Sequence, residues 1–541
     1  MNIEQVLKQA IHKALLKNNV SFPIEQIVIE RSRDEKHGDY ATNIAMQLAS
    51  VLKKSPRDIA TMLVNDINDK AIAKKEIAGP GFINFTITQD YLTNIIPKII
   101  ELGDDFGQLE PENPLKINVE FVSANPTGEL HLGHARGAAI GDSLCRILAK
   151  AGHEVTREYY VNDAGVQIDN LAKSVFARYQ TLLGNPMDVP EDGYHSEHII
   201  DVAQQLIDEA GNKYTKLDKD TLEYFKKRSV EIELKQIKYD LVDFNVNFDV
   251  FTFETDIRTT DTMSKLLSDL SKFTYVEEDA TLLKTSEFGD DKDRVIVKSN
   301  GDYTYFLPDI AYHLDKFSRN YDLLIDVLGA DHHGYINRMK AAMQMFGYKE
   351  NQLHVEIIQM VRLLEDGKEI KMSKRTGNAI TLHELCSEVG VDAVRYFFVA
   401  RAASTHLDFD IDLAKQATNA NPLYYVQYAH ARLKAVLRNG EEIEGKINYD
   451  LLTSKQENDL LICLIDFPLV VEDAANSYSP YKITVYLQRL ATLVHSFYTE
   501  CRIIQEENKE LTATRLALVK ASAITLKNGL DLIGVKAPEY M

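Results

Sequence analysis

The segment from Lys116 to Asp142 constrains the fold more than any other part of the chain. Its first seven residues, KINVEFV, have the pattern of a buried β-strand, and a proline- and glycine-containing loop, NPTG at 125–128, follows. A helix is expected to begin near His134, and its small residues between 135 and 141 indicate that another element packs closely on it. Strand, loop and helix open a βαβ unit, in which phosphates bind at the helix N-terminus. The sequence therefore predicts an α/β domain with a parallel, Rossmann-like sheet.

The patterns on either side predict two further domains, which suits a chain of 541 residues. Residues 1–112 read as a small α+β domain that ends in a polar linker, with one strand expected at 27–29. Residues 113–415 form the α/β domain, with another strand expected at 303–306. In residues 416–541, apolar residues recur at helical spacing, and this pattern predicts an α-helical bundle.

The formal net charge of −20 argues at first against a nucleic-acid partner, because phosphate binding favours a basic surface. However, residues 180–290 alone carry 12 Lys and Arg against 24 Asp and Glu, which is −12. Residues 1–112 and 420–541 are nearly neutral, at −3 and −2. We interpret the stretch at about 180–290 as an acidic insertion in the α/β domain that turns a solvated face away from RNA.

The cysteine spacing and the hydropathy of the sequence indicate in which cellular compartment the protein is expected. The four cysteines lie far apart without a CxxC pair, which argues against a disulfide scaffold or a zinc site and fits a reducing cytosol. No apolar run approaches the ~18–20 residues that a membrane span needs. The amphipathic start carries Glu4 and is not a secretory signal. We expect a cytoplasmic protein with no membrane partner.

Two short motifs carry chemistry. His131 and His134 flank Gly133 at a helix start, where both imidazoles can donate hydrogen bonds to phosphate oxygens and the glycine lets the backbone approach a flat ligand. About 240 residues later, Lys371 and Lys374 can clamp a triphosphate as mobile charges. The alternatives without function are that the two histidines are ordinary surface residues and that the two lysines lie on a solvated basic loop. Both motifs in this order on an α/β background favour the functional interpretation.

HLGH and KMSKR resemble the "HIGH" and "KMSKS" signatures of class I aminoacyl-tRNA synthetases. The segments VEFVSANPTGELHLGHARGAAIGD, GADHHGY, GVDAVRYFFVARAASTHLDFD, APEYM and HGDYATNIAM resemble arginyl-tRNA synthetases, and this likeness covers nearly the full length. Arg375, where the signature has Ser, is a minor departure. The resemblance implies a catalytic domain at 113–415, a tRNA-contacting domain at 1–112 and an anticodon-binding domain at 416–541.

The resemblance also implies a reaction. An arginine–tRNA ligase activates arginine with ATP to arginyl-adenylate, with Mg²⁺ bridging the phosphates. It then transfers arginine to the 3′-terminal adenosine of tRNA(Arg) and releases AMP and pyrophosphate. The catalytic residues would be His131, His134, Lys371 and Lys374. We expect the protein to be a monomer.

A guanidinium needs carboxylates in a planar, bidentate arrangement, and Glu120 and Asp309 are the candidates near the site. The resemblance implies that Tyr305 and Asp309 line the arginine side-chain pocket, and that Glu120, Ser123 and Asn125 complete the amino-acid site. Two alternatives stay open. Asp309 could be a helix N-cap, and Glu120 could be the structural partner of an arginine such as Arg136.

For ATP, the resemblance implies a site made of Gly128, His131, Gly133, His134, Asp331, His332, Met372, Ser373 and Lys374. Asp331, His332 and His333 follow an apolar strand at 323–328 and could suggest a metal site. No further His or Cys pattern supports that interpretation, so we expect no protein-bound metal.

Candidate tRNA contacts in the last domain are Tyr425, Gln427 and Arg432, because aromatic and polar side chains can stack on unpaired bases. The resemblance implies Tyr40 as a further contact, since the first domain resembles the part of the family that touches the tRNA elbow. The tyrosines near 424–428 could equally pack the bundle. A second hypothesis is a synthetase of the same class for cysteine. It is poorly supported, because such a site would require zinc-binding thiols and the four cysteines lie far apart. An inactive tRNA-binding paralogue is a third, and the intact motifs count against it.

Overall fold

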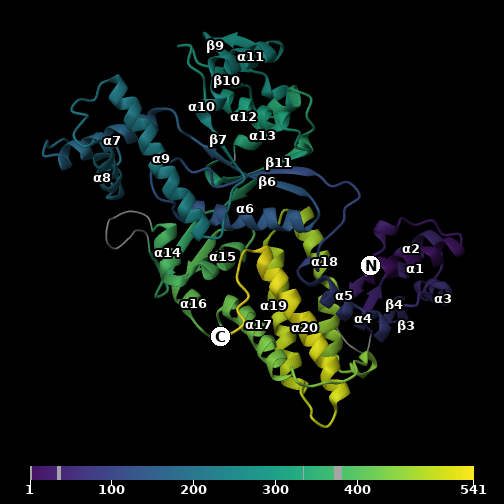
Figure 1. Cartoon of the computed structure of the whole chain (residues 1–541). Coiled ribbons are helices and arrows are strands. Elements are labelled where there is room, and N and C mark those ends of the chain that lie inside the picture. The colour runs from purple at the N-terminus through teal and green to yellow at the C-terminus, as the bar shows by residue number, and fades with distance from the viewer. Residues whose placement is uncertain (1–2, 33–37, 333, 371–379) are drawn as a thin grey trace.

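The computed structural model describes residues 3–32, 38–332, 334–370 and 380–541 (Figure 1). An N-terminal α+β domain, a central α/β domain and a C-terminal helical bundle follow one another along the chain, as the sequence predicts. The first domain packs helices on an antiparallel sheet with strand order β1-β2-β4-β3. Its elements are α1 (Ile3–Lys17), β1 (Glu30–Arg31), β2 (Tyr40–Thr42), α2 (Ile44–Leu52), α3 (Pro56–Asp66), β3 (Ile72–Ala78) and β4 (Phe82–Ile87).

The strand expected at 27–29 is wrong, because the paired strand covers only Glu30–Arg31. Ile27 and Ile29 are buried on either side of the exposed Val28, which gives the alternation that a strand has in sequence. However, the Val28 carbonyl accepts a hydrogen bond from the Thr42 hydroxyl at 2.7 Å and is not part of a strand ladder.

A five-stranded parallel sheet with strand order β12-β11-β5-β6-β7 forms the centre of the second domain. Its strands are β5 (Lys116–Glu120), β6 (Glu154–Val161), β7 (Val250–Phe253), β11 (Leu323–Gly329) and β12 (Leu353–Ile358), and α6 (Leu132–Lys150) connects β5 to β6. The chain leaves β5 on one side to form β6 and later returns on its other side as β11. The order reverses between β5 and β11, and open α/β sheets bind ligands beyond the strand ends at such a point.

Close packing on α6 explains its run of small residues. Phe121, which directly follows β5, is fully buried, and its ring lies so near Gly141 that a Cβ there would come within 2.3 Å of the ring. The strand end and the helix are therefore held together at the position that the sequence marks as crowded.

The acidic stretch at 180–290 contains β7, which pairs with β6 in the central sheet. The stretch is therefore divided into two excursions by a core strand. The two excursions extend a little beyond the stretch at either end. The first contains α7 (Val166–Leu182), α8 (His198–Ala210) and α9 (Lys219–Asp243). The second contains α10 (Glu254–Ile257), α11 (Thr260–Leu270), β8 (Thr274–Glu277), β9 (Ala280–Leu283) and β10 (Arg294–Val297). Both lie at the end of the molecule opposite the far tip of the bundle (Figure 1).

The strand expected at 303–306 is also wrong. Tyr303 forms only an isolated bridge with Val297, and α12 (Phe306–Ser318) begins three residues later. Later elements of this domain are α13 (Tyr335–Met345), β13 (Val361–Glu365), β14 (Lys368–Ile370), α14 (Leu382–Val389), α15 (Val391–Val399), β15 (Leu407–Asp410) and α16 (Ile411–Lys415).

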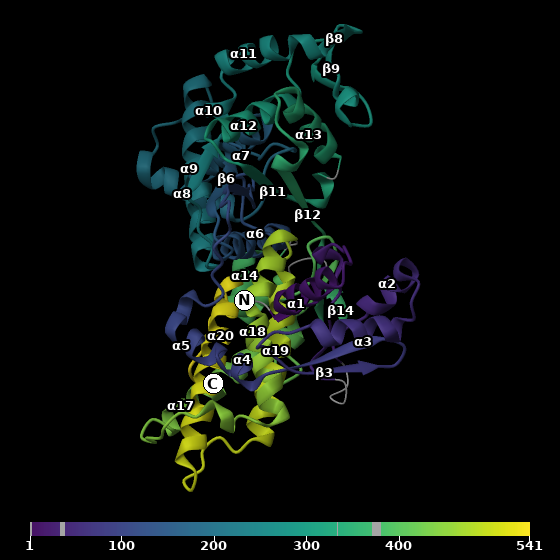
Figure 2. The same cartoon turned by 90° about the vertical axis from the view of Figure 1, so that its right-hand side faces the viewer.

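The bundle consists of α17 (Pro422–Asn439), α18 (Lys455–Asn476), α19 (Tyr481–Glu500) and α20 (Lys509–Leu532). Two helices near the end of the first domain, α4 (Gln89–Thr93) and α5 (Ile95–Leu102), contact α18 and α20, so the N-terminal domain lies beside the bundle (Figure 2). The Asn528 amide of α20 donates to the carbonyls of Gly103 and Phe106, which fixes this junction.

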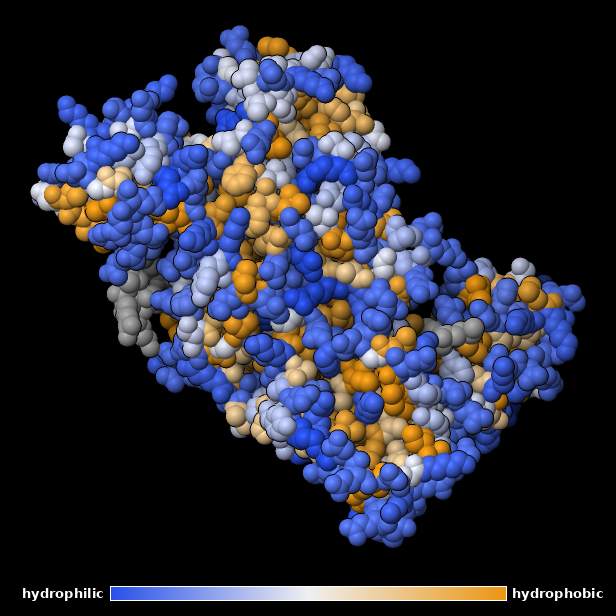
Figure 3. Space-filling view, in the orientation of Figure 1, coloured by the Kyte–Doolittle hydropathy of each residue, from blue (hydrophilic) through white to orange (hydrophobic). Residues whose placement is uncertain are grey.

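Hydrophilic residues predominate on the face shown in Figure 3, and hydrophobic residues are scattered among them. Within the ranges that the structure describes, no helix is long and apolar enough to cross a membrane.

Candidate active site

The carboxyl end of β5 turns sharply and fixes Glu120. Val122 and Ser123 both have positive φ, 67° and 40°, which is strained for a β-branched residue such as valine. The turn lets the Ser123 hydroxyl donate to Glu120 Oε1 at 2.9 Å and accept from the Tyr160 amide at 3.1 Å. Two of the predicted arginine-binding residues are thus in direct contact and are tied to β6.

The two histidines of HLGH stack at the start of α6, with ring centroids 3.7 Å apart. His131 is the N-cap, and its Nδ1 accepts from the Gly133 amide at 3.1 Å, so its N–H lies on Nε2. Desolvation lowers the pKa of His131; desolvation and the neighbouring His131 lower the pKa of His134 to about 3. Both rings are therefore neutral at pH 7. The buried Nδ1 of His134 has no partner among the described residues.

Two other predicted residues lie in the loop before this helix. The Asn125 amide donates to Gln167 Oε1 of α7 at 2.6 Å. Gly128 packs against the His198 ring, which a Cβ on this glycine would approach to 3.2 Å. The loop between β5 and α6 is therefore held by the first acidic excursion.

Asp309 lies in the first turn of α12, whose N-cap is Tyr305, so the structure excludes the N-cap alternative for Asp309. No side chain in the described part of the chain forms a hydrogen bond or ion pair with its carboxylate. Desolvation raises the pKa of Asp309 to about 7; repulsion by Glu120 and other carboxylates adds to this, and His313 opposes it. Tyr305 is 78% exposed at the rim. Asp309 is half-buried, and a desolvated carboxylate with surplus negative charge around it is complementary to a cation.

The sequence did not indicate the group that balances Glu120. Lys316 is fully buried, and its Nζ donates to Glu120 Oε2 at 2.5 Å and to Asp326 Oδ1 at 2.9 Å. His313 Nε2 lies 2.7 Å from Asp326 Oδ2. Asp309, His313 and Lys316 are three to four residues apart on α12, a spacing that places them on one helix face and that could have revealed the cluster.

Arg136 is not the partner of Glu120. Its guanidinium is buried and donates to the backbone carbonyls of Gln359 and Thr405 at 2.7 and 2.8 Å. Glu120 does have a basic partner, but it is Lys316 of α12 and not the arginine of that alternative.

Of the predicted nucleotide residues, Asp331 and His332 lie exposed just beyond β11, with Asp331 Oδ2 and His332 Nε2 3.5 Å apart. Lys371, Met372, Ser373 and Lys374 lie outside the described residues, which stop at Ile370 and resume at Ile380. After the gap, Thr381 bridges to His131 and the Leu382 amide donates to the Leu130 carbonyl at 2.7 Å. The chain following KMSK therefore pairs with the chain at HLGH.

The bundle residues form an aromatic and basic cluster between α17 and α19. The Arg432 guanidinium lies 4.6 Å from the ring centroid of Tyr428 and 4.5 Å from that of Tyr498, and it donates to the Tyr428 hydroxyl. The Tyr425 ring packs against His495 in a tilted arrangement, with ring centroids 4.5 Å apart. These side chains are partly exposed, so they pack the bundle and still present their faces to solvent.

The remaining two candidates have structural contacts. The Gln427 amide donates to Asp392 and to the Lys536 carbonyl, which joins α17 to α15 and the C-terminal segment. Tyr40 is only 2% exposed and belongs to the core of the N-terminal domain. Its side chain does not reach the surface.

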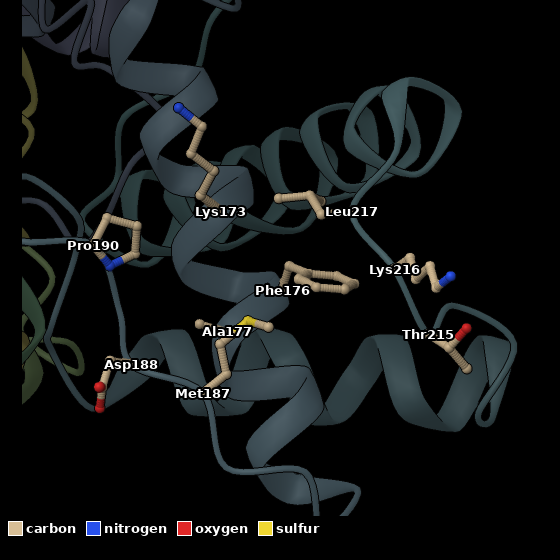
Figure 4. Close-up of a pocket in the computed structure, with 9 residues that line it drawn as sticks. All are labelled: Lys173, Phe176, Ala177, Met187, Asp188, Pro190, Thr215, Lys216 and Leu217. Atoms are coloured by element: carbon tan, nitrogen blue, oxygen red, sulfur yellow. The ribbon is translucent and has the colours of Figure 1, made fainter.

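A cavity of about 400 Å³ lies away from these residues, between α7 and the loops that precede α8 and α9 (Figure 4). Its lining is mainly apolar, with Lys173 and Lys216 at its edges. None of the predicted site residues lines it.

Comparison with known proteins matches every part of the chain. A family described as the arginyl-tRNA synthetase N-terminal domain matches residues 1–87, the class I (R) tRNA synthetase catalytic domain matches 96–399, and the DALR anticodon-binding domain matches 426–541. The chain is 50% identical to the arginine–tRNA ligase of Geobacillus kaustophilus over 553 residues, covering 100% of this chain and 99% of that protein. It is 50% identical to that of Shouchella clausii over 550 residues, covering 99% of each.

The fold agrees with these matches. The arginyl-tRNA synthetase structure of Thermus thermophilus superposes with a TM-score of 0.78 over 100% of both chains, at 23% identity. A parallel sheet with HLGH at the start of its first crossover helix, followed by a helical anticodon-binding domain, defines a class I aminoacyl-tRNA synthetase, a class that uses ATP. The full-length identities are more specific. The chain belongs to the arginyl-tRNA synthetase family.

Proposed function

We propose that the chain performs the arginine–tRNA ligase reaction of its family at the edge of the sheet between β5 and β11. The arginine carboxylate attacks the α-phosphate of ATP to give arginyl-adenylate and pyrophosphate. Arginine then passes to the 3′-terminal adenosine of tRNA(Arg), and AMP is released. Because in-line phosphoryl chemistry needs little covalent help, the protein mainly positions groups and neutralises charge.

His131 and His134 act on the α-phosphate. The Nε2–H of His131 is available for a ligand, and the positive end of the α6 dipole lies beside both rings. Lys371 and Lys374 hold the β- and γ-phosphates. The other residues proposed to bind ATP are Gly128, Gly133, Asp331, His332, Met372 and Ser373.

Mg²⁺ enters this proposal with the nucleotide. In the described part of the chain, no group of three or more His, Cys, Asp or Glu side chains is arranged to hold a metal ion. The ion would neutralise charge on the ATP phosphates, which donate the oxygen ligands that it prefers.

Arginine is recognised by charge. Asp309 and Glu120 accept from the guanidinium, Tyr305 covers it from the rim, and Ser123 and Asn125 complete the amino-acid site. The unpaired, half-buried carboxylate of Asp309 is the observation that carries this assignment, because a desolvated carboxylate among other carboxylates is costly until a cation pairs with it.

The tRNA lies along the bundle, with Arg432 and Tyr425 stacking on unpaired bases and Gln427 holding α17 against the catalytic domain. We propose no direct contact for Tyr40, since it is buried, and place it as support for a tRNA-contacting surface of residues 1–112. We further propose that the protein acts as a monomer in the cytoplasm.

Pyrophosphate exchange with each amino acid, with and without tRNA, tests this function. Exchange should require arginine and should be strongest with tRNA bound. Exchange with cysteine would favour the second hypothesis, and no exchange with any amino acid would favour an inactive paralogue.

A further inference from the structure

We propose that Lys316 is a positioning residue for arginine recognition, which rests on the assignment of Glu120 to the amino-acid site. Its ammonium holds one oxygen of Glu120 while Ser123 holds the other, so that the carboxylate plane is fixed toward the substrate. A carboxylate held at both oxygens cannot rotate, and planar, bidentate guanidinium recognition depends on that orientation.

Lys316 is itself fixed from several sides. Asp326 Oδ1 accepts from its Nζ at 2.9 Å, and the Nζ lies 4.4 Å from the ring centroid of Tyr312. Asp326 also contacts His313 Nε2, and His313 Nδ1 lies 2.8 Å from the backbone carbonyl of Asp309. One network thus connects Glu120 on β5 with the helix turn that carries Asp309.

Stability does not account for a charge at this position. Burying an ammonium is costly, and a well-packed apolar side chain of similar volume is often as stable as a buried ion pair or more so. Here burial opposes the charged form of Lys316, but Asp326, Glu120 and Glu158 outweigh burial and raise its pKa. The ammonium therefore compensates Glu120 and Asp326 and holds their carboxylates in place, and the surplus negative charge that a cationic substrate can pair remains on Asp309.

The test compares Lys316→Met, which removes the charge at nearly constant length, with Lys316→Arg, which keeps it. Lys316→Met should raise KM for arginine in pyrophosphate exchange at least tenfold, and arginine binding measured by calorimetry on the full-length protein with tRNA should weaken equally. KM for ATP should change less than twofold. Lys316→Arg should recover most of the arginine affinity.

Arg319→Met is the matched control. Arg319 is the C-cap residue of the same helix and donates to the buried Glu158 at 2.9 Å. The variant therefore also breaks an ion pair to a buried carboxylate without touching Glu120. It should lower the melting temperature while leaving KM for arginine unchanged. Equal increases of KM for arginine and ATP in Lys316→Met, or the same rise in Arg319→Met, would mean that Lys316 is merely structural.

A double-mutant cycle keeps the proposal testable if Lys316→Met folds poorly, because Glu120→Gln/Lys316→Met leaves fewer unpaired buried charges. In the Glu120→Gln background, the lysine substitution should add less than a twofold further loss of arginine affinity. A full additive loss overturns the proposal. If Glu120→Gln alone leaves KM for arginine unchanged, the assignment of Glu120 to the amino-acid site fails instead.

Discussion

Asp309 is the residue whose environment differs most from that of an ordinary carboxylate. Desolvation, together with repulsion from Glu120, Glu254 and Asp326, raises its pKa to about 7, and the nearby His313 only partly offsets this. The group therefore changes charge within the physiological range. Its raised pKa also has a defined consequence for stability: the protonated form is favoured in the folded protein, and that contribution is lost as the pH rises through about 7.

Arginine binding should consequently depend on pH. Because the guanidinium pairs with ionised Asp309, KM for arginine should rise by up to tenfold per pH unit below about 7 and level off above it. Asp309→Asn should raise KM for arginine at least tenfold at pH 8, with KM for ATP nearly unchanged, and should remove this pH dependence. Without arginine, the variant should melt at a higher temperature than the wild type at pH 8, since a buried charge is gone. A rise of both KM values together would make Asp309 structural.

At the scale of elements, the active site depends on how closely α6 packs on the end of β5. Gly141 admits the Phe121 ring, and the strained turn at Val122 and Ser123 follows directly. One turn earlier on the same helix, Gly137 has more room, because a Cβ there would lie 4.0 Å from Ile358. Alanine substitutions at these two positions change helix propensity alike but differ in crowding, so comparing them isolates the effect of crowding.

Gly141→Ala should lower the free energy of unfolding by about 1–3 kcal/mol, because the new methyl group displaces Phe121 and the turn that holds Glu120. Gly137→Ala should be neutral or stabilise by up to about 1 kcal/mol, as alanine favours a helix. Urea unfolding and KM for arginine measure both effects. Equal stability of the two variants would show that the helix can move away from Phe121 without cost.

At the scale of the whole molecule, the negative charge is concentrated toward one end of the long axis. The two acidic excursions lie at one end, and the bundle, with the N-terminal domain beside it, extends toward the other (Figures 1 and 2). In the acidic part, Arg228 on α9 is already paired, because it contacts Glu209 and Glu231. In the bundle, Arg432 is bound by aromatic rings and leaves its positive charge for a phosphate or a base.

Arg432→Gln should therefore weaken tRNA binding about tenfold, in the range of one stacking contact, whereas Arg228→Gln should leave it unchanged. Filter binding at two salt concentrations measures this, and binding should fall steeply with salt in both variants. A tRNA footprint centred on residues 180–290 would contradict this arrangement of charge.

The sequence by itself determined the class of fold, the order of the domains and the position of HLGH at a helix start. These features depend on local signals, namely strand and helix periodicity, capping residues and glycine-containing turns, which act over a few residues. The same signals misplaced two strands. At 27–29 burial alternates outside the paired strand Glu30–Arg31, and at 303–306 only an isolated bridge at Tyr303 precedes the start of α12.

Only the tertiary structure decided which charges meet. Glu120 pairs with Lys316, which lies 196 residues further along the chain, and not with the nearer Arg136. Likewise, β7 divides the acidic stretch, and Tyr40 is enclosed in a core. Such pairings arise when packing brings distant segments into a common low-dielectric interior, where each buried charge must find a partner, and no local pattern records that outcome.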